Sequence, residues 1–149
     1  MKLTGTYRCP APRARVYAAL IDPVVLQRCI EGAEQLVRTA GDEYDVRMRI
    51  GIGAVKGVFS GTVRLADMQA PEAFTLHVEG KGAPGFVSGS ARIRLDDAEP
   101  GTAITCDADG QVGGVLAAVG SRLVDAAGRR MMDRFFERLG REFDPPTTS

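Results

Sequence analysis

Apolar and polar residues alternate along most of the chain between about residues 34 and 112. In one clear example, Val46, Met48 and Ile50 share a parity, and charged residues stand between them. The alternating stretches are separated by short segments rich in glycine and proline. A period of two residues is typical of antiparallel strands with one buried face, and glycine and proline are typical of the turns between them. The pattern therefore predicts about six antiparallel strands in this region.

A different period marks the C-terminal part of the chain, from Gly113 to Gly140. Here apolar residues recur every three or four positions, which is typical of one buried stripe on a long helix. Near the N-terminus, residues 3–9 alternate like a strand, and two short amphipathic stretches follow on either side of Asp22-Pro23. The predicted fold is α+β: a curved antiparallel sheet wrapped around a long C-terminal helix, with two short helices after the first strand. Such an arrangement can enclose an apolar cavity.

The length and charge of the chain narrow the class of protein. A chain of 149 residues fits one domain. We expect this domain to span residues 1–143, and residues 144–149 to form a disordered tail. Nineteen Lys and Arg balance nineteen Asp and Glu, so the formal net charge is zero. This balance argues against a dedicated nucleic-acid-binding protein.

The cysteines and the apolar runs bear on the cellular compartment. Cys9, Cys29 and Cys106 are widely spaced and form no C-x-x-C pair, which predicts reduced thiols. The first residues contain no apolar stretch of the kind found in signal peptides. No apolar run approaches the length that crosses a bilayer. We therefore expect a cytoplasmic protein.

No group of residues predicts a catalytic or metal site. His77 is the only histidine, and its parity places it on the outer face of its strand. A histidine-activated nucleophile or a zinc site would need such groups clustered. The candidate acids or bases that the pattern places near the expected cavity are Tyr7, Tyr17 and Asp125. We expect no catalytic residue, no bound metal and no cofactor.

Small residues are concentrated where the sheet and the long helix are expected to meet. Gly57 and Gly61 lie on one predicted strand, and Gly120 and Gly128 lie inside the predicted helix. Glycine inside a helix costs up to about 1 kcal/mol relative to alanine, so we expect a compensating role. Two roles fit this pattern. Either the helix approaches the sheet closely at these points, or the small residues leave room for an apolar cavity.

The apolar residues that face this space are the candidate ligand-binding site. An apolar lining with few polar groups is usual for a site that binds a lipophilic molecule. The alternative is that these residues form an ordinary core. The candidate wall consists of Met48, Ile50, Phe59, Val63, Phe74, Leu76, Phe86, Ile93, Leu116, Val119, Leu123, Ala127, Met131 and Phe135.

Several short motifs keep a defined order and spacing along nearly the whole chain. They are Leu3 with Gly5; Asp22-Pro23 with Leu26, Cys29-Ile30, Gly32 and Glu34; GIGAVKGVFSG at 51–61; Gly80, Gly82, Gly85 and Gly89; Gly101-Thr102; and Gly114, Leu116, Gly120, Arg122-Leu123 and Phe135-Phe136. In this order and spacing the chain, from about residue 3 to 143, resembles the CoxG family of carbon monoxide dehydrogenase subunits, within the START-like (SRPBCC) superfamily.

The resemblance implies a helix-grip fold, and it favours the cavity over close packing. It also implies an accessory protein of a molybdenum hydroxylase of the carbon monoxide dehydrogenase type, not the redox enzyme itself. Such a protein would bind a hydrophobic molecule, a quinone or a lipid, in the cavity. Family members often carry Pro-Gly where Glu31-Gly32 stands, and some have a C-terminal extension that anchors them to the membrane. This chain ends at Ser149, so we expect at most transient, peripheral contact with the inner face of the membrane.

Two other functions remain open from the sequence. One is a START-like cyclase or hydrolase that acts on an aromatic or polyketide substrate, which would need an inward acid or base with a shifted pKa. The other is a protein–protein adaptor without a ligand, whose docking surface is the glycine-rich hairpin around Gly57.

Overall fold

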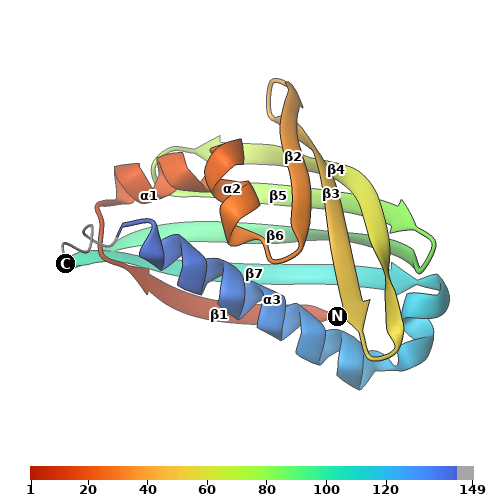
Figure 1. The fold of residues 1–149 in the computed structure, drawn as a ribbon. Helices are drawn as coiled ribbons and strands as arrows, with labels where there is room; N and C mark the ends of the chain where they lie inside the picture. The colour runs from red at the N-terminus through yellow and green to blue at the C-terminus, as the bar shows by residue number, and fades with distance from the viewer. Residues whose placement is uncertain (144–149) are drawn as a thin grey trace, which may run out of the picture.

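The computed structural model describes residues 1–143 (Figure 1). Residues 144–149, for which the sequence predicts a disordered tail, lie outside the described residues. The elements follow the predicted order of a first strand, two short helices, further strands and a C-terminal helix. Along the chain they are β1 (Lys2–Cys9), α1 (Arg13–Leu20), α2 (Pro23–Cys29), β2 (Ala33–Ala40), β3 (Glu43–Ile52), β4 (Val55–Gln69), β5 (Ala73–Gly82), β6 (Gly85–Ala98), β7 (Gly101–Gly113), the 3-10 helix η1 (Gly114–Val119) and α3 (Ser121–Arg141).

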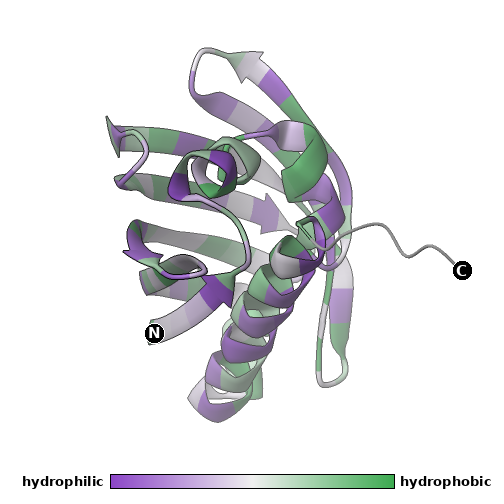
Figure 2. Cartoon of the chain, turned by 90° about the vertical axis from the view of Figure 1, so that its left-hand side faces the viewer, coloured by the Kyte–Doolittle hydropathy of each residue, from purple (hydrophilic) through white to green (hydrophobic). Residues whose placement is uncertain are grey.

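The strands form one seven-stranded antiparallel sheet in the order β1-β7-β6-β5-β4-β3-β2. From β2 to β7 each strand pairs with the next one along the chain, whereas β1 pairs with β7. The three α-helices lie on one side of the curved sheet, and α3 runs beside β1 (Figure 1). Hydrophilic and hydrophobic bands alternate along the strands (Figure 2). This arrangement confirms the predicted α+β helix-grip fold.

The sequence around Asp22 explains where α2 begins. The side chain of Asp22 accepts a hydrogen bond of 2.9 Å from the backbone N–H of Val24. Pro23 occupies the first position of the helix, where its missing N–H is no loss. A capping aspartate followed by proline stabilises a helix start. The dipeptide that was predicted to separate the two short helices therefore does so by capping the second one.

The C-terminal helix is shorter than the sequence predicts. The apolar period from Gly113 to Gly140 predicts one continuous helix, but the structure has η1 and then α3. Gly120 separates them with a φ of 99°, which side chains rarely permit. The prediction that Gly120 lies inside a helix was wrong, because the spacing of apolar residues continues on both sides of the break.

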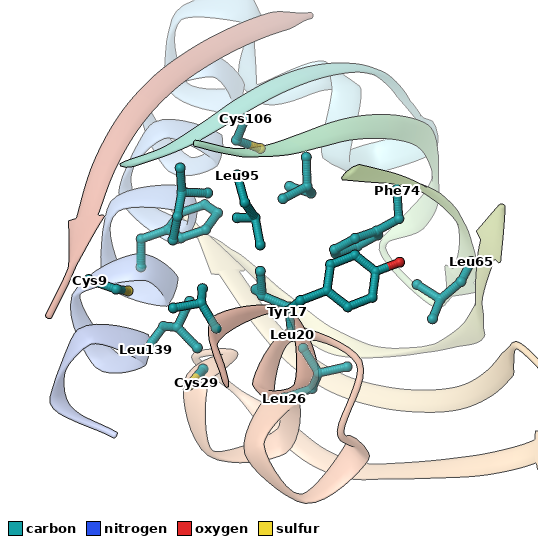
Figure 3. Packing of buried hydrophobic residues seen from close by; sticks show 14 of the residues in the cluster. Cys9, Tyr17, Leu20, Leu26, Cys29, Leu65, Phe74, Leu95, Cys106 and Leu139 are labelled. Atoms are coloured by element: carbon teal, nitrogen blue, oxygen red, sulfur yellow. The ribbon is translucent and has the colours of Figure 1, made fainter. Parts of the chain in front are cut away.

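The interior divides into two apolar clusters. The larger cluster lies where α1 and α2 cover the sheet (Figure 3). Within it the rings of Tyr17 and Phe74 meet edge to face, with their centroids 5.4 Å apart. The smaller cluster is built from Ile52, Phe59 and Leu116, on β3, β4 and η1. The buried apolar residues are thus divided between a region under α1 and α2 and a region beside η1.

Candidate ligand-binding pocket

The strand residues of the predicted wall lie on the face of the sheet that carries the helices, except Phe86. Phe74 pairs with Ile93 on this inner face. Phe86 instead pairs with Lys81 on the outer face and is 49% exposed. Its predicted place in the wall was wrong because it is the neighbour of the inward Val87 and therefore points to the opposite face.

Most other residues of the predicted wall are buried or half-buried. Leu123 is an exception, with 48% of its surface exposed at the first turn of α3. It faces Gly53 at the tip of the β3–β4 hairpin, and a glycine has no side chain to cover it. The buried members are Phe59, Phe74, Ile93 and Leu116, and the half-buried members are Met48, Ile50, Val63, Leu76, Val119, Ala127, Met131 and Phe135.

The buried members of the predicted wall are divided between the two apolar clusters. Phe74 and Ile93 belong to the larger apolar cluster, whereas Phe59 and Leu116 belong to the smaller one. These four side chains are ordinary core, which was the alternative that the sequence left open. The half-buried members are therefore the better candidates for contact with a ligand.

Three half-buried residues of the predicted wall meet in a pocket between β3 and α3. Ile50 comes from β3, and Ala127 and Met131 come from one face of α3. The pocket has a volume of about 90 Å³. The apolar side chains of the lining form its floor, and the charged side chains of Glu31, Arg49 and Arg130 form its rim. The full lining is Glu31, Arg49, Ile50, Gly51, Ile52, Ala127, Arg130 and Met131.

The pocket opens along the edge of β3 because β2 pairs with β3 only as far as Met48, which leaves the edge of residues 49–52 without a neighbouring strand. Their last pair is Ala33 with Met48, and the backbone N–H of Arg49 then donates a 2.9 Å hydrogen bond to the carbonyl of Gly32. Gly32 has a φ of 87°, and a Cβ there would overlap the carbonyl oxygen of Arg49. A glycine is therefore needed where the chain turns from α2 into β2. Beyond this point residues 50–52 pair with β4 and face α3.

Ion pairs hold the rim of the pocket. Nη2 of Arg130 lies 3.4 Å from Oε1 of Glu31, which joins α3 to the loop before β2. Nε of Arg49 lies 3.4 Å from Oε2 of Glu34. The other carboxylate oxygen of Glu31, Oε2, is buried without a hydrogen-bond partner in the described part of the chain. A buried acceptor without a partner is costly, so a hydrogen-bond donor that reached it would be bound favourably.

The charged rim was not predicted from the sequence. Glu31, Arg49 and Arg130 are absent from the predicted wall because only apolar residues were sought there. One signal was available: Arg130 stands three residues after Ala127, a spacing that places both on one side of a helix.

The pocket is small for a lipophilic ligand. Pockets that bury drug-sized molecules have volumes of about 300–1,000 Å³, several times the 90 Å³ found here. A ligand of that size requires α3 to move away from the edge of β3. The Glu31–Arg130 ion pair spans this gap and would have to lengthen.

A larger hollow of about 390 Å³ lies over the outer face of β4, β5 and β6. Most side chains that point to this face carry a hydroxyl group or a charge, and the exception is the aromatic ring of Phe86. It therefore differs from the predicted apolar cavity in both face and chemistry. Its lining is Ser60, Gly61, Thr62, Glu79, Gly80, Lys81, Phe86, Val87 and Ser88.

The glycines of the helix and sheet serve close packing more than a cavity. A Cβ on Gly128 would lie 2.8 Å from Cδ1 of Leu3 and 3.1 Å from Sδ of Met1, so α3 approaches the N-terminal strand closely there. A Cβ on Gly61 or Gly89 would overlap the backbone of the neighbouring strand. Such glycines allow strands to approach and bend. Of the two roles left open by the sequence, close approach of the helix to the sheet fits Gly128, whereas Gly120 has nothing within 4 Å of its Cβ position.

The candidate acids and bases lie outside both hollows. The hydroxyl of Tyr7 donates a 2.7 Å hydrogen bond to Oδ1 of Asp133, and burial together with this carboxylate raises the pKa of Tyr7 to about 12. Burial also raises the pKa of Tyr17, which donates to the carbonyl of Ala73 at 3.4 Å. Both phenols therefore stay protonated at neutral pH. Asp125 is exposed on α3.

The three cysteines are buried and unbonded, and burial raises the pKa of each thiol to about 11. A thiol that stays protonated is a weak nucleophile. Within residues 1–143, no group of three or more His, Cys, Asp or Glu is placed to hold a metal ion. In the same part of the chain, no helix combines the length and the apolar character that a bilayer span needs.

A curved antiparallel sheet around a C-terminal helix, with a pocket between them, places the chain among the helix-grip proteins. The sequence model of the CoxG family of carbon monoxide dehydrogenase subunits matches residues 5–143. The chain belongs to this family.

Solved structures share this fold. A conserved protein from Geobacillus kaustophilus is 30% identical, with a TM-score of 0.90 over 95% of this chain and 94% of that one. A protein from Chromobacterium violaceum is 18% identical, with a TM-score of 0.70 over 97% and 98% of the two chains. The di-domain ARO/CYC BexL is 13% identical, with a TM-score of 0.67 over 99% of this chain and 51% of that one. No curated protein matches the chain.

Proposed function

We propose that this protein is a non-catalytic accessory protein of a carbon monoxide dehydrogenase-type molybdenum hydroxylase. In this proposal it binds a hydrophobic molecule, a quinone or a lipid, between α3 and the sheet, and serves the enzyme in the cytoplasm as a carrier. Membership of the CoxG family supports the link to the enzyme. The observation that carries the binding function is the meeting of Ile50, Ala127 and Met131 in one pocket.

The chemistry of the pocket suits an amphiphile with one polar end. Ile50, Ile52 and Met131 offer an apolar surface for a chain or ring. Arg130 at the rim can donate hydrogen bonds to a carbonyl or phosphate oxygen. Oε2 of Glu31 can accept one from a hydroxyl group. The ligand would thus lie with its apolar part inward and its polar end at the rim.

Isoleucine methyl NMR with a short-chain quinone as the probe tests the binding function. The chain has isoleucines in the pocket, Ile50 and Ile52, and isoleucines far from it, such as Ile21 and Ile104. We expect saturable shifts at the first two methyl groups and small shifts at the others. Equal shifts at all positions, or none, would contradict the proposed site.

Two neighbouring alanines on α3 provide a matched pair of variants. Ala127 lines the pocket and Ala126 is exposed beside it. We expect Ala127→Phe to fill the pocket and weaken quinone binding at least tenfold, and Ala126→Phe to leave it unchanged. Circular dichroism of both variants checks that the fold is kept. Equal affinity in the two variants would place the ligand elsewhere.

The cyclase or hydrolase function receives less support. Its basis is a likeness in fold to proteins such as the di-domain ARO/CYC BexL, at 13% identity. Tyr7 and Tyr17, the acid or base candidates with a raised pKa, do not line the pocket. Turnover of an aromatic polyketide that is lost in Tyr17→Phe would revive it.

The adaptor function is favoured by one observation, the hollow on the outer face with the exposed Phe86. Gly57 is a poor test position because a Cβ there would overlap Pro84. Phe86→Ala is cleaner. If this variant fails to bind a purified molybdenum hydroxylase while still binding the quinone, docking and ligand binding use separate faces.

A further inference from the structure

The two oxygens of the Glu31 carboxylate have different surroundings. Oε1 lies 3.4 Å from Nη2 of Arg130 at the rim of the pocket. Oε2 is covered from solvent and has no hydrogen-bond partner among residues 1–143. In the described part of the chain, no other buried side-chain nitrogen or oxygen lacks a partner. Buried polar atoms are nearly always paired, so this oxygen calls for an explanation.

The cations of the rim do not satisfy this oxygen. The contact of Arg130 with Oε1 is long, since charge-assisted hydrogen bonds are usually about 2.7–2.9 Å. Nε of Arg49 is directed to the carboxylate of Glu34, 3.4 Å away. The carboxylate of Glu31 therefore has one unused acceptor, and its contact with Arg130 leaves room for a small group to enter between them.

The free edge of β3 adds a backbone donor and acceptor to the same pocket. The backbone N–H of Arg49 points away from β4, to the carbonyl of Gly32. Backbone groups alternate in direction along a strand, so the N–H and C=O of Gly51 point to the same side. β2 has already ended there, and Gly51 is exposed and lines the pocket. The acceptor on Glu31 differs from these groups because it is both charged and covered.

A hydroxyl group suits the space between Glu31 and Arg130 better than a carbonyl group does. A hydroxyl both donates and accepts hydrogen bonds, so it can donate to Oε2 of Glu31 while it accepts from the guanidinium of Arg130. A carbonyl only accepts. It can bond to Arg130, but it leaves Oε2 unpaired and places a second acceptor beside it. An unpaired buried acceptor costs more than an ordinary hydrogen bond contributes.

From this chemistry we infer that Glu31 makes the pocket selective for the hydroxyl form of its ligand. Of a quinone and its hydroquinone, the pocket binds the hydroquinone more tightly, by about tenfold. This selectivity rests on the proposed function, because it requires that a quinone-type ring enters between β3 and α3. It adds to that function a preferred redox state and the residue that sets it.

A preference for the hydroquinone changes the redox behaviour of the bound ring. Reduction adds two electrons and two protons to the quinone, and its two carbonyl groups become hydroxyl groups. Tighter binding of the reduced form makes this reduction more favourable in the pocket than in free solution. For a two-electron couple, a tenfold difference in affinity raises the midpoint potential by about 30 mV. The bound quinone is therefore a stronger electron acceptor than the free one.

Methyl NMR with three probes tests the selectivity on the wild-type chain. The probes are a short-chain benzoquinone, its hydroquinone under anaerobic conditions, and the dimethyl ether of that hydroquinone, which keeps the ring but has no O–H donor. We expect the methyl groups of Ile50 and Ile52 to report a dissociation constant about tenfold lower for the hydroquinone than for either other probe. A quinone or an ether that binds as tightly as the hydroquinone would overturn the selectivity.

The same titrations separate this selectivity from the proposed function. Saturable shifts with all three probes at equal affinity would leave the binding site in place and refute the role of Glu31. If none of the probes shifts the methyl groups of Ile50 and Ile52, the proposed binding function itself fails, and the selectivity fails with it.

Two variants show whether Glu31 sets the preference. Glu31→Gln replaces one carboxylate oxygen with an NH2 group, which can donate to a quinone carbonyl. We expect the preference to fall below about twofold in this variant. Glu137→Gln breaks an ion pair with Arg141 elsewhere on α3 and should keep the full preference. An unchanged preference in Glu31→Gln, or an equal loss in both variants, would refute the assignment to Glu31.

The midpoint potential of the bound probe gives a readout that a merely structural role of Glu31 does not move. It is measured by redox titration of the quinone with the protein in excess. We expect a rise of about 30 mV over the free probe with the wild type and with Glu137→Gln, and little rise with Glu31→Gln. No rise with the wild type, or the same rise with all three proteins, would overturn the inference.

Discussion

The hydroxyl of Tyr7 on β1 and the carboxylate of Asp133 on α3 are joined by a 2.7 Å hydrogen bond. The ring of Tyr7 also stacks on Phe136, one turn further along the helix, with the centroids 4.3 Å apart. These contacts attach the C-terminal helix to the edge strand of the sheet. The helix is thus held along β1, whereas its other side faces the pocket at β3.

Replacing Tyr7 with Phe should remove the hydrogen bond and keep the stacked ring. We expect the free energy of unfolding to fall by about 1 kcal/mol at neutral pH, since the exposed Asp133 can be hydrated in the variant. Urea unfolding followed by circular dichroism measures this difference. Tyr7→Ala, which also loses the stacking on Phe136, should cost clearly more.

The pH dependence of the same variant gives a second test. The pKa of Tyr7 is raised from 10.0 to about 12 in the folded chain. Above pH 10 the unfolded chain loses a proton that the folded chain keeps, so this stabilisation is complete below pH 10 and is lost as the pH rises towards 12. Tyr7→Phe should therefore lose less stability than the wild type over this interval. The buried cysteines contribute equally to the pH dependence of both proteins. Equal slopes of unfolding free energy against pH would therefore show that Tyr7 does not contribute.

Two phenylalanines that the sequence placed in one wall should differ widely in their effect on stability. Phe59 is buried in the smaller cluster, whereas Phe86 is exposed on the outer face. We expect Phe59→Ala to lower the free energy of unfolding by about 3–5 kcal/mol. Phe86→Ala should change it by less than about 1 kcal/mol. Thermal unfolding of the two variants measures this difference. Similar losses of stability in both would instead support the sequence-based prediction that both rings are buried in one wall.

The fold was predictable because strand pairing is local in this chain. Each strand from β2 to β7 pairs with its neighbour in the sequence, so the parity of residues such as Val46 and Met48 was enough to assign the inner face. Phe86 was assigned to the wrong face because it was chosen for its apolar side chain and not for its parity. Its parity places it on the outer face of β6.

The site was only partly predictable for a different reason. Ile50, Ala127 and Met131 were found from their apolar period. The rim depends on the Glu31–Arg130 contact, which joins residues 99 positions apart. Periodicity describes one element at a time and cannot show which charged residues of two elements meet.

The turn at Gly32 should be sensitive to any side chain. Its φ is 87°, and a Cβ there would overlap the carbonyl oxygen of Arg49. Gly41 is a matched control, since it also has a positive φ, 52°, but has nothing within 4 Å of its Cβ position. We expect Gly41→Ala to cost about 1 kcal/mol and Gly32→Ala at least twice as much. Equal costs in chemical denaturation would show that the overlap at Arg49 is easily relieved.

The Glu31–Arg130 ion pair should control the rate at which a ligand enters the pocket. Both side chains are partly exposed, so the pair contributes less than about 1 kcal/mol to stability. It nevertheless spans the gap that must widen for a ligand larger than the 90 Å³ pocket. We expect Glu31→Gln to speed the uptake of a short-chain quinone several-fold in stopped-flow mixing, with little change in unfolding free energy. Glu137→Gln is the control because it breaks a 2.7 Å pair with Arg141 on the same helix. If both variants speed uptake equally, or neither does, ligand entry does not pass between Glu31 and Arg130.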